Sequence, residues 1–277
     1  MSCAQARSGI MSEKLRVGVI GVGYLGRFHA RIYNDMQGVE LVGVADTDRE
    51  TADRVAGEYA TRAFYDPMAL LDEVDVVSVV VPTSLHRQVA LPYLEKGIHM
   101  LLEKPVASTL EDARVIVETA RKHGATLQIG HLERFNAGIM ALADHVNEPR
   151  FIEAHRLGPF VERATDVDEV TDLMIHDIDI VLSLVGEELT NISATGTPVL
   201  TDHVDIANAR LEFANGAVAN VTASRVSNKK FRRIRVFGRN SYRAINFVDQ
   251  QLEVAYRGEI PEGQKYPEIV YESHSIT

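Results

Sequence analysis

The chain has 277 residues, 45% of them hydrophobic, and a formal net charge of −10. An acidic chain has no general attraction to nucleic acid or anionic lipid, and no stretch here approaches the ~20 consecutive apolar residues of a membrane span. We therefore expect neither nucleic acid nor a membrane as a partner. The single cysteine, Cys3, excludes a disulfide framework and a cysteine-built metal site, so a cytoplasmic protein is the simplest interpretation.

Three regions are expected along the chain. Residues 1–13 are polar, lack the apolar core of a secretory signal and are expected to be a disordered tail. Residues 14–130 and 131–277 differ in their hydrophobic pattern and are expected to form two domains.

The first domain alternates apolar strand-like runs with amphipathic helical patterns. This alternation predicts a doubly wound α/β fold with a parallel sheet covered on both faces. The predicted strands are 16–20, 41–45, 74–81, 99–102 and 126–129, and the predicted helices are 25–35, 49–59, 84–96 and 110–123.

The second domain begins with one predicted helix, 167–185, and continues with alternating strand-like segments from residue 191 onward. Asn215-Gly216 lies between two of these segments and is a strong hairpin signal. The pattern predicts an α+β domain built on a largely antiparallel open sheet. Its exposed face is expected to be large and apolar, which favours a homodimer or homotetramer.

A glycine motif follows the first predicted strand and opens the first helix. Gly21 permits a tight turn, Gly23 lets the backbone approach a pyrophosphate, and Gly26 lets helix and strand pack closely. Asp46, at the end of the second strand, stands where an acid binds the ribose hydroxyls of NAD. The carboxylate disfavours the 2′-phosphate of NADP, although nearby Arg49 weakens that preference. A bare structural turn is the alternative.

Two further segments follow strand ends, where ligands of doubly wound folds bind. Lys104, in Glu103-Lys104-Pro105, is placed to meet a substrate beside the cofactor, and a strand-ending salt bridge is the alternative. Thr83 and His86 are predicted to face the nicotinamide, and a helix cap with an exposed histidine is the alternative.

The predicted helix 167–185 carries Asp172 and His176, spaced to share one face. A carboxylate beside a histidine can orient the ring and raise its basicity, as a general base requires. A core or surface histidine is the alternative. A weaker metal interpretation combines these two residues with Asp179 and His131, but none of the pairs has a recognised ligand spacing.

Arg134 and Asn136 follow the last predicted strand of the first domain and are candidates for binding a polar substrate; solvated charges at a helix start are the alternative. One basic cluster lies on a predicted turn and strand further on. It indicates either a solvated hairpin end or a contact for an anionic group such as a phosphate. Its members are Lys229, Lys230, Arg232, Arg233, Arg235 and Arg239.

The segments "GVIGVGYLGRFHARIY", "EKPVA" and "DLMIHDID" resemble the Gfo/Idh/MocA oxidoreductases. The resemblance implies a Rossmann domain that binds NAD(P) and a C-terminal domain that holds the substrate and builds an oligomer. It implies that Lys104 positions the substrate hydroxyl and His176, with Asp172, is the acid/base, all three also contacting substrate. The residues that it assigns to the cofactor are Gly21, Gly23, Tyr24, Leu25, Gly26, Asp46, Pro82, Thr83, His86, Glu103 and Lys104.

Three more segments, "GHLERFN", "HRLGPF" and "TDVDEVTDLMIHDIDIVLSLV", resemble the nucleotide-sugar 3-dehydrogenases of the UDP-N-acetylglucosamine type. The expected reaction is NAD-dependent oxidation of a secondary alcohol on a sugar or nucleotide sugar, without a metal. The alternatives are a non-catalytic NAD-binding regulatory protein and an enzyme that uses NAD for redox-assisted elimination. Many members of the family are longer, so the C-terminus at Thr277 is expected to be either truncated or naturally short.

Overall fold

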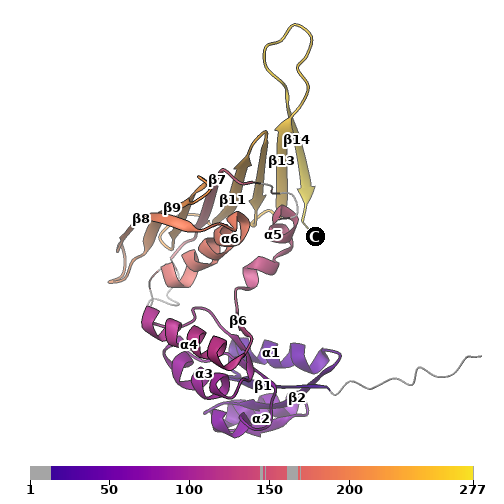
Figure 1. Ribbon diagram of the computed structural model, residues 1–277, viewed down its shortest axis with the longest axis vertical. Helices are drawn as coiled ribbons and strands as arrows, with labels where there is room; N and C mark the ends of the chain where they lie inside the picture. Colours follow the sequence, from indigo (N-terminus) through magenta and orange to yellow (C-terminus); the bar gives the residue numbers. More distant parts are fainter. Residues whose placement is uncertain (1–13, 144–145, 147, 161–167, 169, 277) are drawn as a thin grey trace, which may run out of the picture. The chain divides into compact units, whose positions relative to one another are not determined.

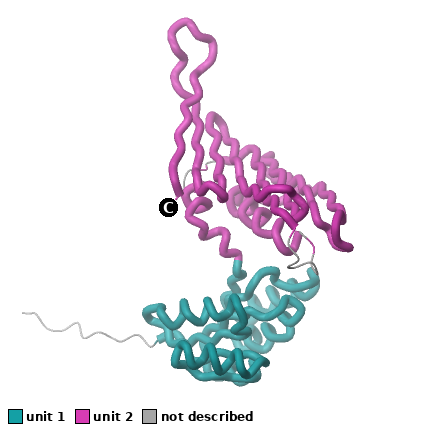
Figure 2. Tube along the Cα trace, turned by 180° about the vertical axis from the view of Figure 1, so that it is seen from behind, with its two compact units in different colours: residues 1–130 teal, residues 131–277 magenta. Residues whose placement is uncertain are grey.

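The computed structural model describes residues 14–143, 146, 148–160, 168 and 170–276, so the predicted tail at 1–13 lies outside the described residues. The chain divides into two compact units, Met1–Gly130 and His131–Thr277 (Figures 1 and 2). Within the described ranges, every helix is too short or too polar to cross a membrane.

The first unit is a six-stranded parallel sheet with the strand order β3-β2-β1-β4-β5-β6, which is the order of a dinucleotide-binding Rossmann fold. The doubly wound prediction is therefore confirmed. The strands are β1 (Leu15–Ile20), β2 (Val39–Ala45), β3 (Arg62–Phe64), β4 (Val76–Val79), β5 (His99–Leu102) and β6 (Leu127–Ile129). The sequence pattern missed β3, because its three residues are too few to show a period.

Helices cover both faces of this sheet, because neighbouring residues of each strand point to opposite sides. Val19 and Val44 pack in one cluster with α1 and α2, whereas Val77 and Val79 pack in another with α3 and α4. The helices are α1 (Tyr24–Asp35), α2 (Arg49–Glu58), α3 (His86–Glu95) and α4 (Leu110–His123), with short 3₁₀ turns η1 (Pro67–Leu70) and η2 (Thr83–Leu85).

The second unit is an eight-stranded sheet of order β14-β13-β12-β11-β7-β10-β9-β8, antiparallel except for the pair β7–β10. The strands are β7 (Phe151–Leu157), β8 (Leu189–Thr197), β9 (Ile206–Phe213), β10 (Val218–Ser224), β11 (Phe231–Gly238), β12 (Ser241–Asn246), β13 (Gln251–Arg257) and β14 (Ile269–Ser275). The largely antiparallel open sheet is confirmed. The predicted Asn215-Gly216 hairpin joins β9 to β10, with Gly216 at φ +79°.

Two helices, α5 (Ala137–Ala143) and α6 (Ile175–Val185), pack on one face of the sheet together with the short turn η3 (Leu132–Phe135). Small residues such as Ala154, Ala209 and Ala219 line this face and let α6 approach closely. The predicted helix 167–185 differs at its start, where Val170–Met174 forms a π-helical turn, η4, before α6 begins.

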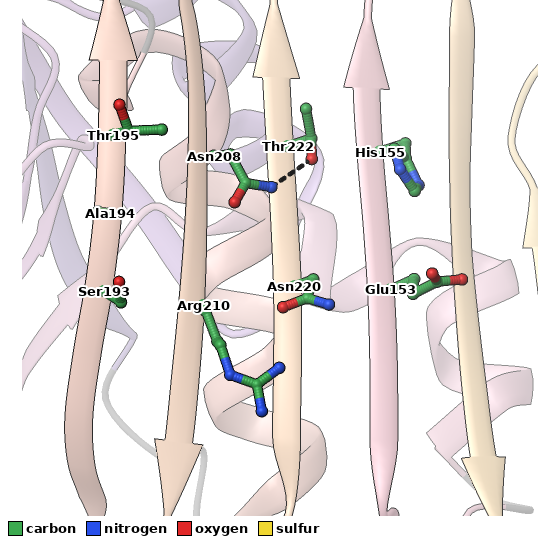
Figure 3. A pocket seen from close by; sticks show the side chains of 9 residues that line it. All are labelled: Glu153, His155, Ser193, Ala194, Thr195, Asn208, Arg210, Asn220 and Thr222. Atoms are coloured by element: carbon green, nitrogen blue, oxygen red, sulfur yellow. Dashed lines mark hydrogen bonds between the residues drawn. The ribbon is translucent and has the colours of Figure 1, made fainter.

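The opposite face of the sheet is polar at its centre. A hollow of about 450 Å³ is lined there by Glu153, His155, Asn208, Arg210 and their neighbours (Figure 3). Burial lowers the pKa of His155 in this hollow. The expectation of a large apolar open face is therefore wrong at the centre of the sheet, because polar side chains alternate with the alanines that face α6.

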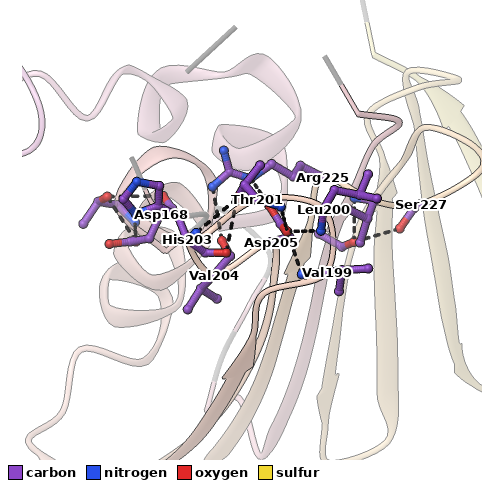
Figure 4. Close-up of polar contacts among 12 residues, drawn as sticks. Asp168, Val199, Leu200, Thr201, His203, Val204, Asp205, Arg225 and Ser227 are labelled. Atoms are coloured by element: carbon purple, nitrogen blue, oxygen red, sulfur yellow. Dashed lines mark hydrogen bonds and ion pairs between the residues drawn. The ribbon is translucent and has the colours of Figure 1, made fainter. Parts of the chain in front are cut away.

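The loop between β8 and β9 is fixed by one buried carboxylate, Asp205 (Figure 4). Its Oδ2 accepts hydrogen bonds from the backbone N–H groups of Val199, Leu200 and Thr201 at 2.7, 2.6 and 2.9 Å, and Arg225 Nε lies 3.3 Å from Oδ1. Burial alone would raise the pKa of Asp205, but these hydrogen bonds outweigh it and hold the pKa far below its usual range. The carboxylate thereby ties the loop to the end of β10.

Candidate functional site

The glycine loop between β1 and α1 has the geometry of a phosphate cradle. Gly21 has φ +80°, and a Cβ there would lie 2.4 Å from Val80 O. A Cβ on Gly26 would lie 1.8 Å from Gly21 O, so only glycine allows this close packing of helix and loop. Among the residues that the structure describes, no atom beyond its chain neighbours lies within 4 Å of a Cβ built on Gly23. Gly23 is also the N-cap of α1 and makes no side-chain cap, which leaves room for a phosphate at the helix N-terminus.

Asp46 stands beside this loop, as predicted. Its Oδ2 accepts a hydrogen bond from Val22 N at 2.9 Å, and its Oδ1 accepts one from Asp48 N at 3.0 Å. The carboxylate is thus held at the carboxyl end of β2, where it can accept from ribose hydroxyls. Arg49 takes part in none of these contacts of Asp46. Its guanidinium lies over the ring of Tyr65, 4.6 Å from the centroid.

The segment after β4 differs from its prediction. His86 is 1% exposed, and its Nδ1 and Nε2 lie 3.2 and 3.0 Å from the carbonyl oxygens of Val106 and Val81. The ring is therefore an internal brace for the chain around Pro82 and Thr83 rather than an exposed histidine. Neither η2 nor α3 has a side-chain cap, so the alternative in which Thr83 or Ser84 caps the helix is wrong.

Glu103 and Lys104 follow the end of β5 and differ in burial. The Glu103 side chain is buried and directed at His29, whose Nε2 lies 3.4 Å from Oε1. Lys104 is half-buried. Any contact of Glu103 with the cofactor would therefore have to come from its backbone, whereas Lys104 keeps a side chain long enough to reach a ligand.

In the second unit, Asp172 lies in the π-helical turn η4 and His176 in the first turn of α6. Asp168 begins this segment: its Oδ1 accepts from Thr171 N at 2.8 Å, and its O accepts from Asp172 N. Both Asp172 and His176 are half-buried. A π-helical turn is common at functional sites because it re-aims side chains, and here it directly precedes the predicted acid/base.

Buried ion pairs anchor α6 beside His176. Arg156 on β7 donates to both carboxylate oxygens of Asp177, at 2.9 and 3.0 Å, and to Glu133 Oε1 at 3.1 Å. Burial by itself lowers the pKa of Arg156, but the hydrogen bonds that it donates to Asp177 outweigh burial and raise the pKa. The sequence interpretation missed Arg156, since β7 itself was not predicted.

Arg134 and Asn136, the predicted substrate contacts, have partners within the second unit. Arg134 donates two hydrogen bonds of 2.6 Å to the carboxylate of Asp179, which raises the pKa of Arg134, and Asn136 Oδ1 accepts from Gly138 N at 3.0 Å at the start of α5. Their assignment to substrate is a prediction that this geometry disfavours. His131 Nδ1 lies 3.9 Å from Asp179 Oδ2, but the guanidinium already there opposes a metal cation.

The basic cluster separates into two groups on the strand β11. Arg233 and Arg235 form ion pairs with Glu253 and Glu153, which neutralises them. Arg232 pairs in register with Arg156 and is half-buried. Burial and the neighbouring Arg156 lower its pKa, and no carboxylate of the described chain lies within ion-pair distance of it.

The sequence interpretation also missed His29 and Ser78, which form a buried hydrogen bond of 2.8 Å between Nδ1 and Oγ. A signal was present, because His29 follows Gly26 at the helical spacing of the buried face of α1. A histidine in that stripe indicates a partner inside the fold.

The residues of the first unit fit a bound dinucleotide on structural grounds. The loop has a cradle that a Cβ at Gly21 or Gly26 would fill, an uncapped helix N-terminus, and an ordered carboxylate, Asp46, at the ribose position. Such a donor set suits a pyrophosphate and a ribose with a free 2′-hydroxyl. Among the parts of the chain with described coordinates, no group of three or more histidine, cysteine or acidic residues could hold a metal ion.

Comparison with known proteins gives the same assignment. Residues 15–131 match the Gfo/Idh/MocA family described as an oxidoreductase family with an NAD-binding Rossmann fold, and residues 117–242 match the C-terminal domain of that family. UDP-N-acetylglucosamine 3-dehydrogenase of Acidithiobacillus ferrooxidans is 42% identical over 245 residues, which cover 88% of this chain and 78% of that enzyme. The scyllo-inositol 2-dehydrogenase (NAD(+)) of Bacillus subtilis is 29% identical over 242 residues, covering 78% and 69%.

Solved structures agree. The UDP-N-acetylglucosamine 3-dehydrogenase GnnA from Acidithiobacillus ferrooxidans superimposes with a TM-score of 0.86 at 40% identity, over 95% of this chain and 84% of that one. A levoglucosan dehydrogenase in complex with NADH has the same fold, with a TM-score of 0.79 at 21% identity over 94% and 80% of the two chains. The chain therefore belongs to the Gfo/Idh/MocA oxidoreductases and is an NAD-dependent dehydrogenase whose first unit is the Rossmann domain.

Proposed function

We propose that the chain oxidises a secondary alcohol of a nucleotide sugar, with the C3 hydroxyl of UDP-N-acetylglucosamine as the first candidate. The observation that carries the proposal is the 42% identity, over 88% of the chain, to an enzyme named for that reaction. Lys104 and His176, on which the chemistry would depend, are both present, which favours an enzyme over a non-catalytic NAD-binding regulator.

The proposed roles follow from the chemistry of each side chain. NAD supplies the hydride acceptor when bound. His176 takes the proton of the substrate hydroxyl, and Asp172 orients its ring. Lys104 donates to the same oxygen and stabilises the negative charge that develops there. The phosphates of the dinucleotide are assigned to the glycine loop and the N-terminus of α1, and its ribose to Asp46.

A nucleotide sugar also carries a diphosphate, and we assign its anchor to Arg232. Its guanidinium is half-buried, and no carboxylate of the described residues lies at ion-pair distance, so an anionic ligand need not displace one of them. Exposed Lys229 and Lys230 precede it and add positive charge. Arg233 and Arg235, which lie on the other face of β11 and form ion pairs, are not assigned to the diphosphate.

A symmetric homodimer or homotetramer in the cytoplasm belongs to the same proposal. The open sheet face offers aromatic contacts, including Phe151–Phe237 and Phe237–Tyr242 with centroids 5.7 and 4.9 Å apart, beside the ion pair of Arg235 with Glu153. Mixed aromatic and charged surfaces of this kind suit a self-complementary interface. Light scattering that finds only monomer at micromolar concentration would contradict this part.

The decisive test is a spectrophotometric screen. The purified protein is mixed with NAD or NADP and with UDP-N-acetylglucosamine, other UDP-sugars, free sugars and inositols, and reduced nicotinamide is followed by absorbance. We expect NAD to be reduced in the presence of UDP-N-acetylglucosamine. His176→Ala is the matched inactive control. Tight NAD binding without reduction by any compound would support the regulatory alternative. Cofactor reduced and reoxidised within one turnover would support redox-assisted elimination.

A further inference from the structure

A buried polar network joins three elements of the NAD-binding unit. His29 on α1 lies between Ser78 on β4 and Glu103 after β5: Nδ1 is 2.8 Å from Ser78 Oγ, and Nε2 is 3.4 Å from Glu103 Oε1. The exposures of the three residues are 8%, 0% and 7%. The Tyr33 hydroxyl hydrogen-bonds to Ser78 from the same helix, and burial raises the pKa of that tyrosine. None of the proposed catalytic steps uses these side chains.

The network holds the Glu103 carboxylate in one place. A Cβ on Gly130 would lie 2.6 and 3.0 Å from its two oxygens, so the backbone of Gly130 closes one side. Glu103 N donates to Val79 O at 3.1 Å, and Gly130 N donates to Leu102 O at 2.8 Å. A carboxyl group enclosed in this way is costly without a polar neighbour. Oε1 makes no hydrogen bond among the described residues, and His29 Nε2, 3.4 Å away, is the polar group that faces it.

We propose that His29, oriented by Ser78, positions Lys104 by fixing the adjacent Glu103. Anchoring the Glu103 side chain inward fixes the backbone from which Lys104 extends, so the ammonium group is presented in one direction. His29 lies on the helix whose N-terminus faces the glycine loop, and the network therefore links the phosphate-binding helix to the lysine. His29 and Ser78 are positioning residues. The inference rests on the proposed function only in the role given to Lys104.

Substitutions at His29 separate the two contacts of its ring. His29→Gln keeps an amide near Nε2 and the contact with Glu103, whereas His29→Asn keeps a polar group near Nδ1 and loses that contact. Ser78→Ala removes the orienting hydroxyl and leaves His29 and Glu103 in place. His123→Leu, at the exposed C-terminal end of α4, is the matched control.

Steady-state kinetics with NAD and the nucleotide sugar measure the effect. A misplaced reacting group costs up to about 10²-fold, so we expect His29→Asn and Ser78→Ala to lower kcat by about 10- to 100-fold, with the KM for NAD within about twofold of wild type. His29→Gln should recover most of kcat, and the pH profile of kcat should shift in His29→Asn but not in His123→Leu. A lower melting temperature with kcat and its pH profile unchanged would overturn the proposal.

A second measurement does not depend on activity. Brief acetylation with limiting acetic anhydride, mapped by peptide mass spectrometry, reports the reactivity of Lys104 relative to the other lysines. We expect this relative rate to change in His29→Asn and Ser78→Ala and to return toward wild type in His29→Gln. Equal rates in all variants would refute the positioning role. If the wild type oxidises no sugar but the rates change as expected, the proposed function fails and the positioning role stands.

Discussion

Arg156 and Asp177 form a bidentate pair in which both side chains are almost completely buried, 4% and 3% exposed. Arg156 Nε and Nη2 donate to Asp177 Oδ2 and Oδ1, so the planar guanidinium fixes both the position and the rotation of the carboxylate. Since Asp177 directly follows His176, this pair sets the rotation of α6 about its axis. The pair thereby connects the strand β7 to the proposed acid/base.

Asp177→Ala is expected to destabilise the protein strongly. Removing one partner leaves a buried guanidinium without its counter-charge, which typically costs about 3–5 kcal/mol of unfolding free energy. Urea denaturation of the wild type and of Asp177→Ala measures the difference in their free energies of unfolding. Glu212→Gln breaks the exposed pair with Arg210 and should cost no more than about 1 kcal/mol. Similar losses in both variants would show that burial does not decide the effect.

His176→Ala is expected to lose turnover while keeping cofactor affinity. A positioned general base contributes about 10²- to 10⁴-fold in rate, and kcat should fall by that factor. NAD affinity, measured by calorimetry, should be unchanged, because the glycine loop and Asp46 belong to the other unit. Asp172→Asn should give a smaller fall, since it only orients the ring. Turnover close to wild type in His176→Ala would remove the histidine from this role.

Asp46→Ala is expected to change the cofactor preference. The wild-type carboxylate, held by Val22 N and Asp48 N, can accept from a ribose 2′-hydroxyl and repels a 2′-phosphate. The variant should lose about tenfold or more in the ratio of NAD to NADP affinity, equivalent to about 1.4 kcal/mol. Titration of both dinucleotides measures this ratio, with Asp35→Ala at the end of α1 as the control. An unchanged ratio of NAD to NADP affinity would show that the ribose does not bind at Asp46.

Most strands and helices of the first unit could be predicted, because each of the longer ones shows a regular hydrophobic period. The glycine loop and Asp46 were found for the same reason, since a βαβ unit fixes where a phosphate and a ribose lie. The three-residue strand β3 and the strands β7 and β14 were missed. In β7, Arg156 places a charge on the buried face of the strand. That charge interrupts the alternation of apolar and polar residues from which a strand is predicted.

Side-chain partners were harder to predict than elements. Arg134 and Asp179 are far apart in sequence, and the two hydrogen bonds between them come from tertiary packing that no local spacing reports. His86 was predicted to face the nicotinamide, but its two carbonyl partners come from residues that only the fold brings together. The π-helical turn at Asp172 could not be predicted from the sequence either, because its spacing differs from that of an α-helix by a single residue.

Asp205→Asn is expected to destabilise the protein in a pH-dependent way. The hydrogen bonds that hold the folded pKa of Asp205 below its usual range stabilise the ionised form, so their contribution is fully present above the unfolded pKa of about 3.9. It is lost as the pH falls below that value toward the folded pKa. The melting temperatures of wild type and variant should differ most above about pH 4 and converge as the pH falls from about 4 to 2. A constant difference across this range would show that charge plays no part.

Arg232→Met is expected to weaken binding of the nucleotide sugar without weakening NAD. The substitution keeps the length and apolar stem of the side chain and removes its charge. A charge-assisted hydrogen bond contributes about 1.5–3 kcal/mol, so the KM for UDP-N-acetylglucosamine should rise by about 10- to 100-fold. Arg239→Met, exposed beyond the end of β11, controls for the general loss of one positive charge.

A competition experiment separates the diphosphate from the sugar. UDP alone should inhibit the wild type competitively against the nucleotide sugar, and Arg232→Met should lose most of that inhibition, because the free diphosphate has no other half-buried cation assigned to it. Uncharged N-acetylglucosamine should bind both proteins equally and weakly. An equal rise in KM for Arg239→Met, or equal inhibition of both proteins by UDP, would show that the basic cluster acts only as a solvated hairpin end.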